Sequence, residues 1–108
     1  MSNVATQDQQ DALLDLLDQV MQHELDFLTE LGPLILCASA LGVAKDTRSF
    51  ARLFEAAHAL VIRECMHLDE ELGLITVEDR GEKSGRRFFA LTPKGAHFTK
   101  ADPLEMAS

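Results

Sequence analysis

The stretch LDEELGLITVEDRGEKSGRRFFALTPKG, from Leu68 to Gly95, changes its periodicity in a way that indicates the class of fold. Gly73 is typical of a helix end, and the residue types at 74–77, namely Leu, Ile, Thr and Val, favour a strand. The motif RRFFALT, at 86–92, predicts a second strand. A polar loop with two glycines, Asp79–Arg86, separates the two strands, so we expect them to form a hairpin.

The end of this stretch predicts one more helix. Thr92 and Pro93 have the pattern of a helix N-cap followed by proline at the first helical position. A short last helix is therefore expected from Pro93 to about Lys100.

Residues 8–31 predict a long amphipathic N-terminal helix. Apolar residues recur at helical spacing, no glycine or proline interrupts them, and the polar face is acidic. Such a helix must bury its apolar stripe, either on its own domain or on a second copy of the chain.

Two further helical regions lie between this segment and the hairpin. Gly32 and Pro33 end the first helix, and PLILCASALG, at 33–42, is apolar enough to lie at the centre of the core. Asp46 or Thr47 can cap the next helix. Residues 47–72 are helical by periodicity, either as a single helix or as two helices joined by a tight turn near Glu55–His58.

The charge of the chain is strongly uneven along its length. The net charge is −8, yet residues 1–44 hold seven acids without a lysine or arginine, and residues 64–79 hold six acids without a base. The basic residues concentrate in two blocks, 45–63 and 80–100. For the place where a polyanion can dock, the local sign of the charge matters more than the total.

The residues of the opening stretch resemble the end of a winged helix-turn-helix domain of bacterial transcription regulators, of the MarR and PadR kind. The resemblance rests on a helix-ending phrase at Leu68–Ile75, a basic hairpin at Asp79–Arg87 and the phrase Leu91–Gly95. It covers residues 33–100. It implies a recognition helix at about Ala57–Leu72 that enters the major groove of double-stranded DNA, with the hairpin as a wing beside it.

The resemblance and the basic blocks together name the candidate DNA-binding residues. On the groove side they are Arg48, Arg52, His58 and Arg63, and on the wing they are Arg80, Lys83, Arg86 and Arg87. The alternatives are ordinary surface charge for the first block and a mobile solvated loop for the second. A different class of function also stays open, because the acidic run at 64–79 suits an interaction module that meets a basic protein partner without binding DNA.

Other kinds of site find little support. The loop GEKSG, at 81–85, is followed by a strand, so it lacks the strand-to-helix setting of a phosphate-binding loop. Glu64 and His67 form a single Glu-x-x-His pair, whereas a di-metal bundle needs two. Cys37 and Cys65 lie in apolar helical segments and are expected to be reduced core thiols. We expect no enzyme activity, no catalytic residue, no metal and no cofactor.

The expected fold is α+β, mainly α: a winged helix-turn-helix domain with an additional long N-terminal helix. Residues 1–7 are expected to be a flexible N-terminus, 8–31 the N-terminal helix that dimerises, 32–100 the winged helix-turn-helix domain and 101–108 a flexible tail. The expected function is DNA-binding control of transcription by a cytoplasmic homodimer that does not engage a membrane, with a protein partner left open.

Overall fold

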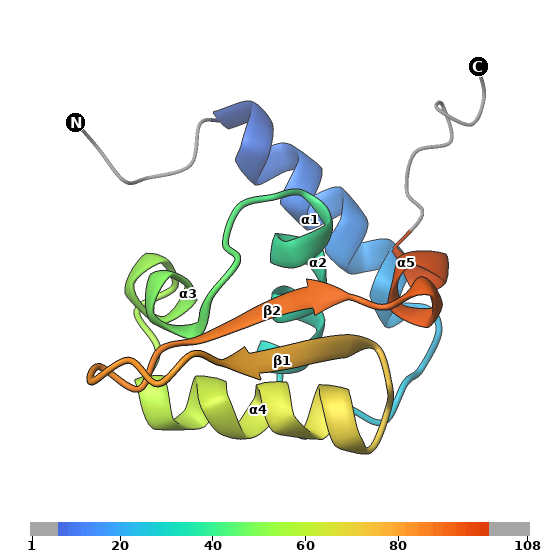
Figure 1. The fold of residues 1–108 in the computed structure, drawn as a ribbon. Helices are drawn as coiled ribbons and strands as arrows, with labels where there is room; N and C mark the ends of the chain where they lie inside the picture. Colours follow the sequence, from blue (N-terminus) through green and yellow to red (C-terminus); the bar gives the residue numbers. More distant parts are fainter. Residues whose placement is uncertain (1–6, 100–108) are drawn as a thin grey trace.

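The computed structural model describes residues 7–99 and confirms a mainly helical α+β fold with a two-stranded antiparallel sheet (Figure 1). The flexible termini expected at 1–6 and 101–108 lie outside the described residues, and Gln7 belongs to the first helix instead of a flexible end. None of the helices in residues 7–99 combines the length and the apolar character needed to cross a membrane. In chain order the elements are α1 (Gln7–Met21), α2 (Leu31–Ala40), α3 (Thr47–Leu53), α4 (His58–Glu70), β1 (Ile75–Asp79), β2 (Arg87–Leu91) and α5 (Pro93–Phe98).

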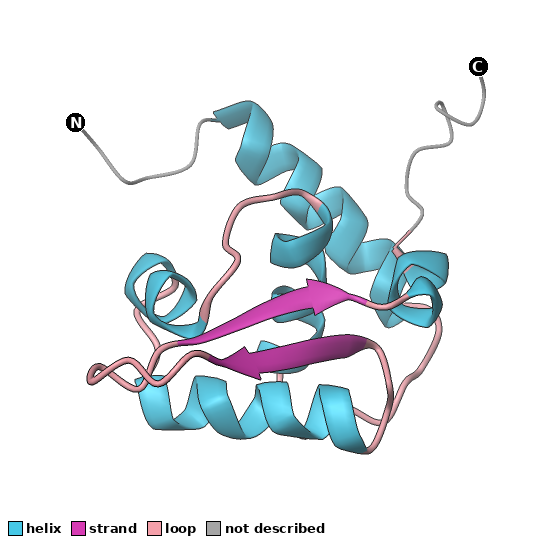
Figure 2. Cartoon of the chain, viewed as in Figure 1, coloured by secondary structure: helices cyan, strands magenta, loops and turns pink. Residues whose placement is uncertain are grey.

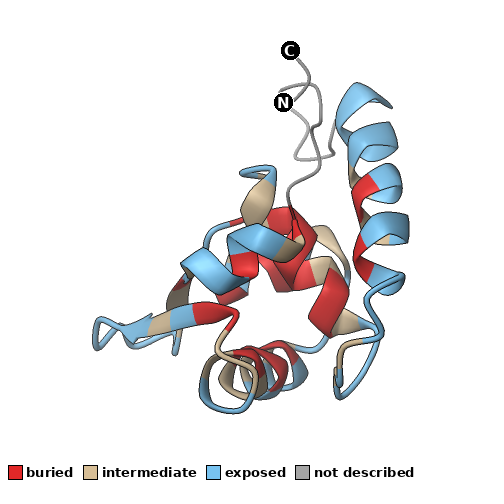
Figure 3. Cartoon of the chain, turned by 90° about the vertical axis from the view of Figure 1, so that its right-hand side faces the viewer, coloured by how far each residue is buried: buried red, intermediate tan, exposed pale blue. Residues whose placement is uncertain are grey.

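Helix α2 is the centre of the core, as its apolar sequence predicts. It packs against α1, α4 and β2, and most of its residues are buried (Figure 3). Cys37 on α2 and Cys65 on α4 are buried and form no disulfide with each other, which confirms that both belong to the core. Burial raises the pKa of each thiol to about 12, with Glu64 contributing at Cys65, so the thiolate form of both is disfavoured at neutral pH.

The N-terminal helix is shorter than predicted. It ends at Met21, and residues 22–30 form an irregular connector in which Glu24 has a φ of 51°. The connector packs Leu25 and Phe27 against the core. The prediction of a single helix over 8–31 is therefore wrong, and the cause is packing that local sequence does not show.

Two side chains of α4 hold the connector in place. The Glu64 carboxylate is almost fully buried and accepts hydrogen bonds from the N–H groups of Leu28 (3.0 Å) and Thr29 (3.4 Å) and from the Thr29 hydroxyl (2.8 Å). The His67 ring nitrogen Nε2 lies 2.8 Å from the carbonyl oxygen of Asp26. The Glu-x-x-His pair thus gives the connector the polar partners that a continued helix would have supplied from within.

Helices α3 and α4 resolve the alternative left open for residues 47–72. The region is two helices, and Glu55 in the turn between them has a φ of 53° (Figure 2). A turn of this kind often holds glycine because glycine has no side chain to clash at positive φ. Here glutamate takes that conformation, so the turn lacks the glycine that would have marked it in the sequence. Asp46 is the N-cap of α3 and accepts from the Ser49 N–H at 2.9 Å.

The hairpin forms where it was predicted. Strands β1 and β2 pair in antiparallel register, with Val77 opposite Phe89. The second edge of β2 meets residues 45–46, since Asp46 forms an isolated bridge with Phe88 and the Phe89 N–H donates to the Lys45 carbonyl at 3.0 Å. On β1, the Val77 N–H donates to the Asp69 carboxylate of α4 at 3.1 Å. The sheet is therefore held on one side by residues 45–46, which lead into α3, and on the other by α4.

The phrase Leu91–Gly95 has a clear physical basis. The Thr92 hydroxyl accepts from the Gly95 N–H at 3.0 Å as the N-cap of α5, and it donates to the Gly73 carbonyl at 2.7 Å. A side-chain carbon at Gly95 would overlap the backbone carbonyl oxygen of Leu74, which cannot move aside without shifting the chain. The last helix starts as predicted and ends at Phe98, while Lys100 lies outside the described residues.

We predict that Gly95→Ala destabilises the fold by about 1–3 kcal/mol, because the added methyl forces α5 away from the turn before β1. The measurement is urea denaturation followed by circular dichroism. Ala96→Ser is the control, since Ala96 is exposed on the same helix, and it should cost no more than about 0.5 kcal/mol. Equal effects of the two substitutions would contradict this account of Gly95.

Candidate nucleic-acid interface

A fully buried hydroxyl connects three elements that carry basic residues. The Thr47 Oγ1 atom, at the start of α3, accepts a hydrogen bond from the backbone N–H of Arg87 on β2 at 3.0 Å. It also lies 2.7 Å from Nε2 of His58 at the start of α4. Because the oxygen already accepts from Arg87, its own proton can be donated to a neutral His58. Thr47 thereby sets where the hairpin and α4 lie relative to α3.

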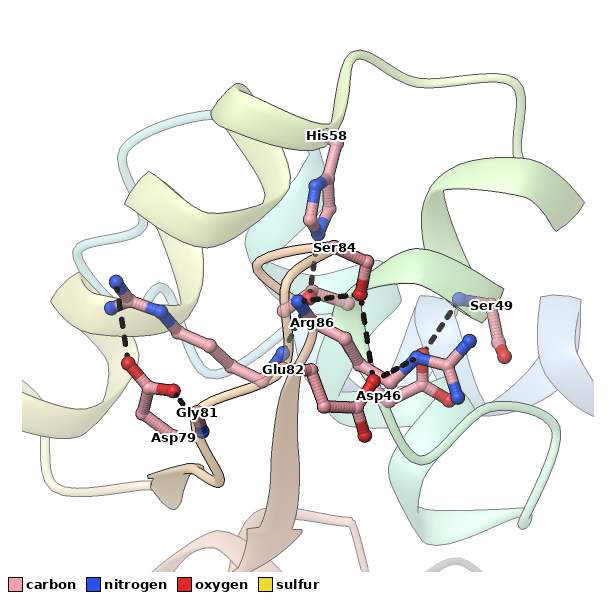
Figure 4. Close-up of polar contacts among 10 residues, drawn as sticks. Asp46, Ser49, His58, Asp79, Gly81, Glu82, Ser84 and Arg86 are labelled. Carbon is pink, nitrogen blue, oxygen red and sulfur yellow. Dashed lines mark hydrogen bonds and ion pairs between the residues drawn. The ribbon is translucent and has the colours of Figure 1, made fainter.

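Asp46 strengthens the same junction. Its carboxylate caps α3 through the Ser49 N–H, and its Oδ2 atom lies 3.4 Å from Nε of Arg86 (Figure 4). The Nε atom is buried and, within residues 7–99, has no partner with hydrogen-bond geometry, so the attraction between Asp46 and Arg86 is one of charge. Removal of Arg86 would leave the buried Asp46 carboxylate without its cation.

All the hairpin arginines are paired with carboxylates of the chain. Arg86 also lies 3.7 Å from Glu82, Arg87 lies 4.0 Å from Asp79, and Arg80 lies 3.0 Å from Glu78. The Arg80 guanidinium also stacks over the Phe88 ring, 3.9 Å from its centroid. In the hairpin, Lys83 is the predicted cation for which the described residues provide no ion-pair or hydrogen-bond partner. The hairpin is thus less positive than its count of basic residues suggests.

The hairpin tip lies beside the start of α4. A side-chain carbon placed on Gly85 would be 3.9 Å from Cε1 of His58. Further along, the Arg87 guanidinium reaches Sδ of Met66 on α4 at 3.6 Å. The tip and the first turns of α4 therefore form one continuous surface at the same end of the molecule as α3 (Figure 1).

Three of the predicted groove-side residues meet in one hollow at this end. A hollow of about 250 Å³ is lined by Arg48, Arg52 and His58 together with two alanines of α3 and the following turn. Both arginines are exposed, and within residues 7–99 neither has a hydrogen-bond or ion-pair partner. An anion that enters this hollow would meet two unneutralised guanidinium groups and an imidazole.

Arg63 lies apart from this group. It is exposed on α4 and lines a different hollow, formed by α4 and the segment Leu28–Leu34. The predicted set therefore divides into the hollow at α3, the largely self-paired hairpin and the isolated Arg63.

The surroundings of His58 favour the neutral form of its ring. Burial and the neighbouring Arg48 lower the pKa of His58 below 6.5, Arg87 adds to this effect, and Asp46 opposes it. A neutral ring is the form that accepts the Thr47 proton. An approaching phosphate would favour the protonated ring instead.

The sequence indicates the basic residues of this surface but not the buried hydrogen bonds that hold them in position. It indicated Asp46 as a possible cap, a role that the structure confirms, but Thr47 was considered only as an alternative cap. Nothing local could indicate that the Thr47 hydroxyl bonds to a backbone group 40 residues later. Glu64 and His67, the residues of the Glu-x-x-His pair, anchor the connector.

Comparison with known proteins finds no matching family model, no similar curated protein and no similar solved structure.

We predict that His58 makes the stability of the fold depend on pH. The pKa of His58 is lowered in the folded chain, so the unfolded chain binds the proton more readily. Its contribution to stability is fully present above pH 6.5 and is lost as the pH falls from 6.5 through the lower pKa of the folded chain. His58→Gln, which keeps a neutral acceptor, should therefore show a smaller fall in the urea midpoint between about pH 7.5 and 5.5 than the unchanged chain.

The exposed His97 supplies the control for this measurement. His97→Gln should keep the full pH dependence. If His58→Gln also keeps it, the Thr47–His58 contact does not depend on the neutral ring.

Proposed function

We propose that this protein is a DNA-binding transcriptional regulator of the winged helix-turn-helix type, in which α4 is the recognition helix and the hairpin is the wing. The order of the elements, the bridge from residues 45–46 to β2 and the place of the hairpin beside α4 support this proposal. The residues that resemble MarR and PadR regulators fall on α4, the hairpin and the start of α5.

The hollow with Arg48, Arg52 and His58 is the observation that carries the proposal. Its two arginines lie on α3, and its His58 lies at the start of α4 beside the hairpin tip. Phosphates on the edge of a groove would come close to these residues when α4 enters it. The two free arginines would release counterions on binding DNA, which makes affinity depend steeply on salt. Arg63 is exposed further along α4, and in this proposal it would contact base edges or the far strand.

The wing plays a smaller electrostatic role in this proposal than its sequence implies. Lys83 at the tip is free to meet a phosphate, and Arg80 has to give up an exposed ion pair and its stacking over Phe88. Arg86 and Arg87 are held more firmly, since Arg86 neutralises the buried Asp46 and the Arg87 backbone is bound to Thr47. These two residues are proposed to keep the hairpin in position and to contact DNA only secondarily.

A protein-interaction module is the alternative function. The net charge of −8 is unfavourable for a DNA binder, and pairing within the hairpin removes part of its basic character. The response to salt separates the two functions. DNA binding should weaken steeply as salt rises, whereas docking through apolar surface should not.

Dimerisation through the N-terminal helix stays a prediction. The stripe is buried in part on the chain's own core, through Leu16 and Val20, while Leu14 and Met21 remain exposed. The exposed Asp11 and Asp18 lie beside Leu14 on the helix surface, so a second copy would bring like charges together there. The particle mass in solution decides this question.

We predict that Arg48→Ala combined with Arg52→Ala weakens binding to duplex DNA and lowers the salt slope of log K by about one to two. The reason is the loss of two cations that the chain does not neutralise itself. Fluorescence anisotropy of labelled random duplex DNA at two or more salt concentrations measures both quantities. Neither side chain is buried, so the fold should be retained, and circular dichroism confirms this.

Lys94→Ala is the matched control, because it removes one exposed cation on α5, which lies away from α3 and the hairpin tip (Figure 1). It should leave both affinity and salt slope close to their original values. If the unchanged protein binds no duplex even at low salt, or if the double variant binds as the unchanged chain does, the DNA-binding proposal fails.

A further inference from the structure

An apolar groove lies on the side of α4 that faces the connector. It has a volume of about 480 Å³ and is lined mainly by four leucines, Leu28, Leu31, Leu34 and Leu60, with Thr29, Glu30, Arg63 and Glu64 at its polar positions. Leu28 is 46% exposed and Leu60 is 50% exposed, so two large apolar side chains face solvent on opposite walls of one groove. Exposed apolar groups gathered at a concavity mark binding surfaces, whereas isolated ones do not.

The groove is preformed. One wall is the rigid helix α4, and the other is the connector that Glu64 ties to it through Leu28 and Thr29. Gly32 allows this close approach, since a side-chain carbon there would lie 2.6 Å from the Glu64 carboxylate. With three donors satisfying it, that carboxylate supports the wall and needs no ligand of its own.

The charge around the groove is mostly negative. The connector wall belongs to the stretch 7–44, which holds seven acids and no lysine or arginine. Among these acids, Glu30 lines the groove itself, and Glu24 and Asp26 are exposed on the connector that leads to it. Arg63 is the cation on the α4 wall. An occupant that carries positive charge along the connector side is therefore favoured.

We propose that this groove docks a basic amphipathic helix of another protein. Its apolar face would place side chains at i, i+3 or i+4 and i+7 against the four leucines, and its lysines or arginines would lie along Glu30 and the acidic connector. A second copy of this chain is a poor occupant through α1, because α1 is itself acidic and would meet the acidic connector. The docking surface does not depend on DNA binding.

Arg63 would have opposite effects on DNA binding and on docking of a basic helix. For DNA, Arg63 is a cation that favours binding, whereas for a basic helix it is the repulsive group among the described residues that line the groove. Arg63→Glu should thus weaken DNA binding and strengthen docking of the helix. The two proposals can therefore fail independently of each other.

The test uses a labelled synthetic helix as the probe. It has lysine and alanine at most positions and leucines at i, i+3, i+4 and i+7, and a peptide of the same composition with scrambled leucines is its control. Fluorescence anisotropy measures its affinity for the full chain and for single variants. We expect Leu60→Ser to weaken binding by about tenfold, Glu30→Lys to weaken it by about threefold and Arg63→Glu to strengthen it by about threefold.

Two variants on α1 control for nonspecific apolar binding and for the change in net charge. Leu14→Ser removes another exposed leucine, and Asp15→Lys makes the same charge change as Glu30→Lys on a different surface. Both should bind the probe as the unchanged chain does. All of the substituted positions are at the surface, so circular dichroism should show unchanged folding.

The proposal is overturned if the scrambled peptide binds equally well, if Leu60→Ser has no effect or if the α1 variants weaken binding as much as the groove variants. It is also overturned if Leu60→Ser converts a dimer into a monomer, since the groove would then be occupied by a second copy. Loss of DNA binding without any change in probe affinity would leave this proposal standing and concern only the function proposed above.

Discussion

The hydrogen bonds of the Thr47 hydroxyl are the constraint on which the basic end of the molecule depends. One buried oxygen binds the backbone of β2 and the ring of His58, and it belongs to the first residue of α3. The neighbouring Asp46 adds the helix cap, the attraction to Arg86 and the bridge to Phe88. Three elements that are distant in sequence are thus held at one corner, and a change of their relative position would have to break buried polar contacts.

Two sides of helix α4 and its first turn each contribute to a different part of the molecule. One side enters the core through Val61, Cys65 and Leu68. Another anchors the connector with Glu64 and His67 and builds the apolar groove with Leu60. The first turn, at His58, meets the hollow with the free arginines. Because one rigid helix supports all these surfaces, an event that moves it would change the groove and the hollow together.

Most elements could be predicted because they have local signals: Gly73 before β1, two glycines in the loop, and Thr92 with Pro93 at the start of α5. The end of α1 could not, since Met21 is followed by no breaker and the connector depends on Glu64, far along the chain. For the candidate site, sequence showed which residues are basic. It could not show that Asp46 and Glu82 neutralise Arg86, because ion pairing depends on the tertiary fold.

This ion pairing determines which arginines would contribute most to the free energy of binding a polyanion. A phosphate that approaches Arg86 has to compete with two carboxylates, one of them buried, and would weaken the contacts that hold the hairpin in place. A phosphate that approaches Arg48 or Arg52 competes with no carboxylate of the described residues. The free energy of DNA binding would therefore come more from α3 and the start of α4 than from the hairpin. In a chain of net charge −8, the few cations without an acidic neighbour matter more than the densest basic run in the sequence.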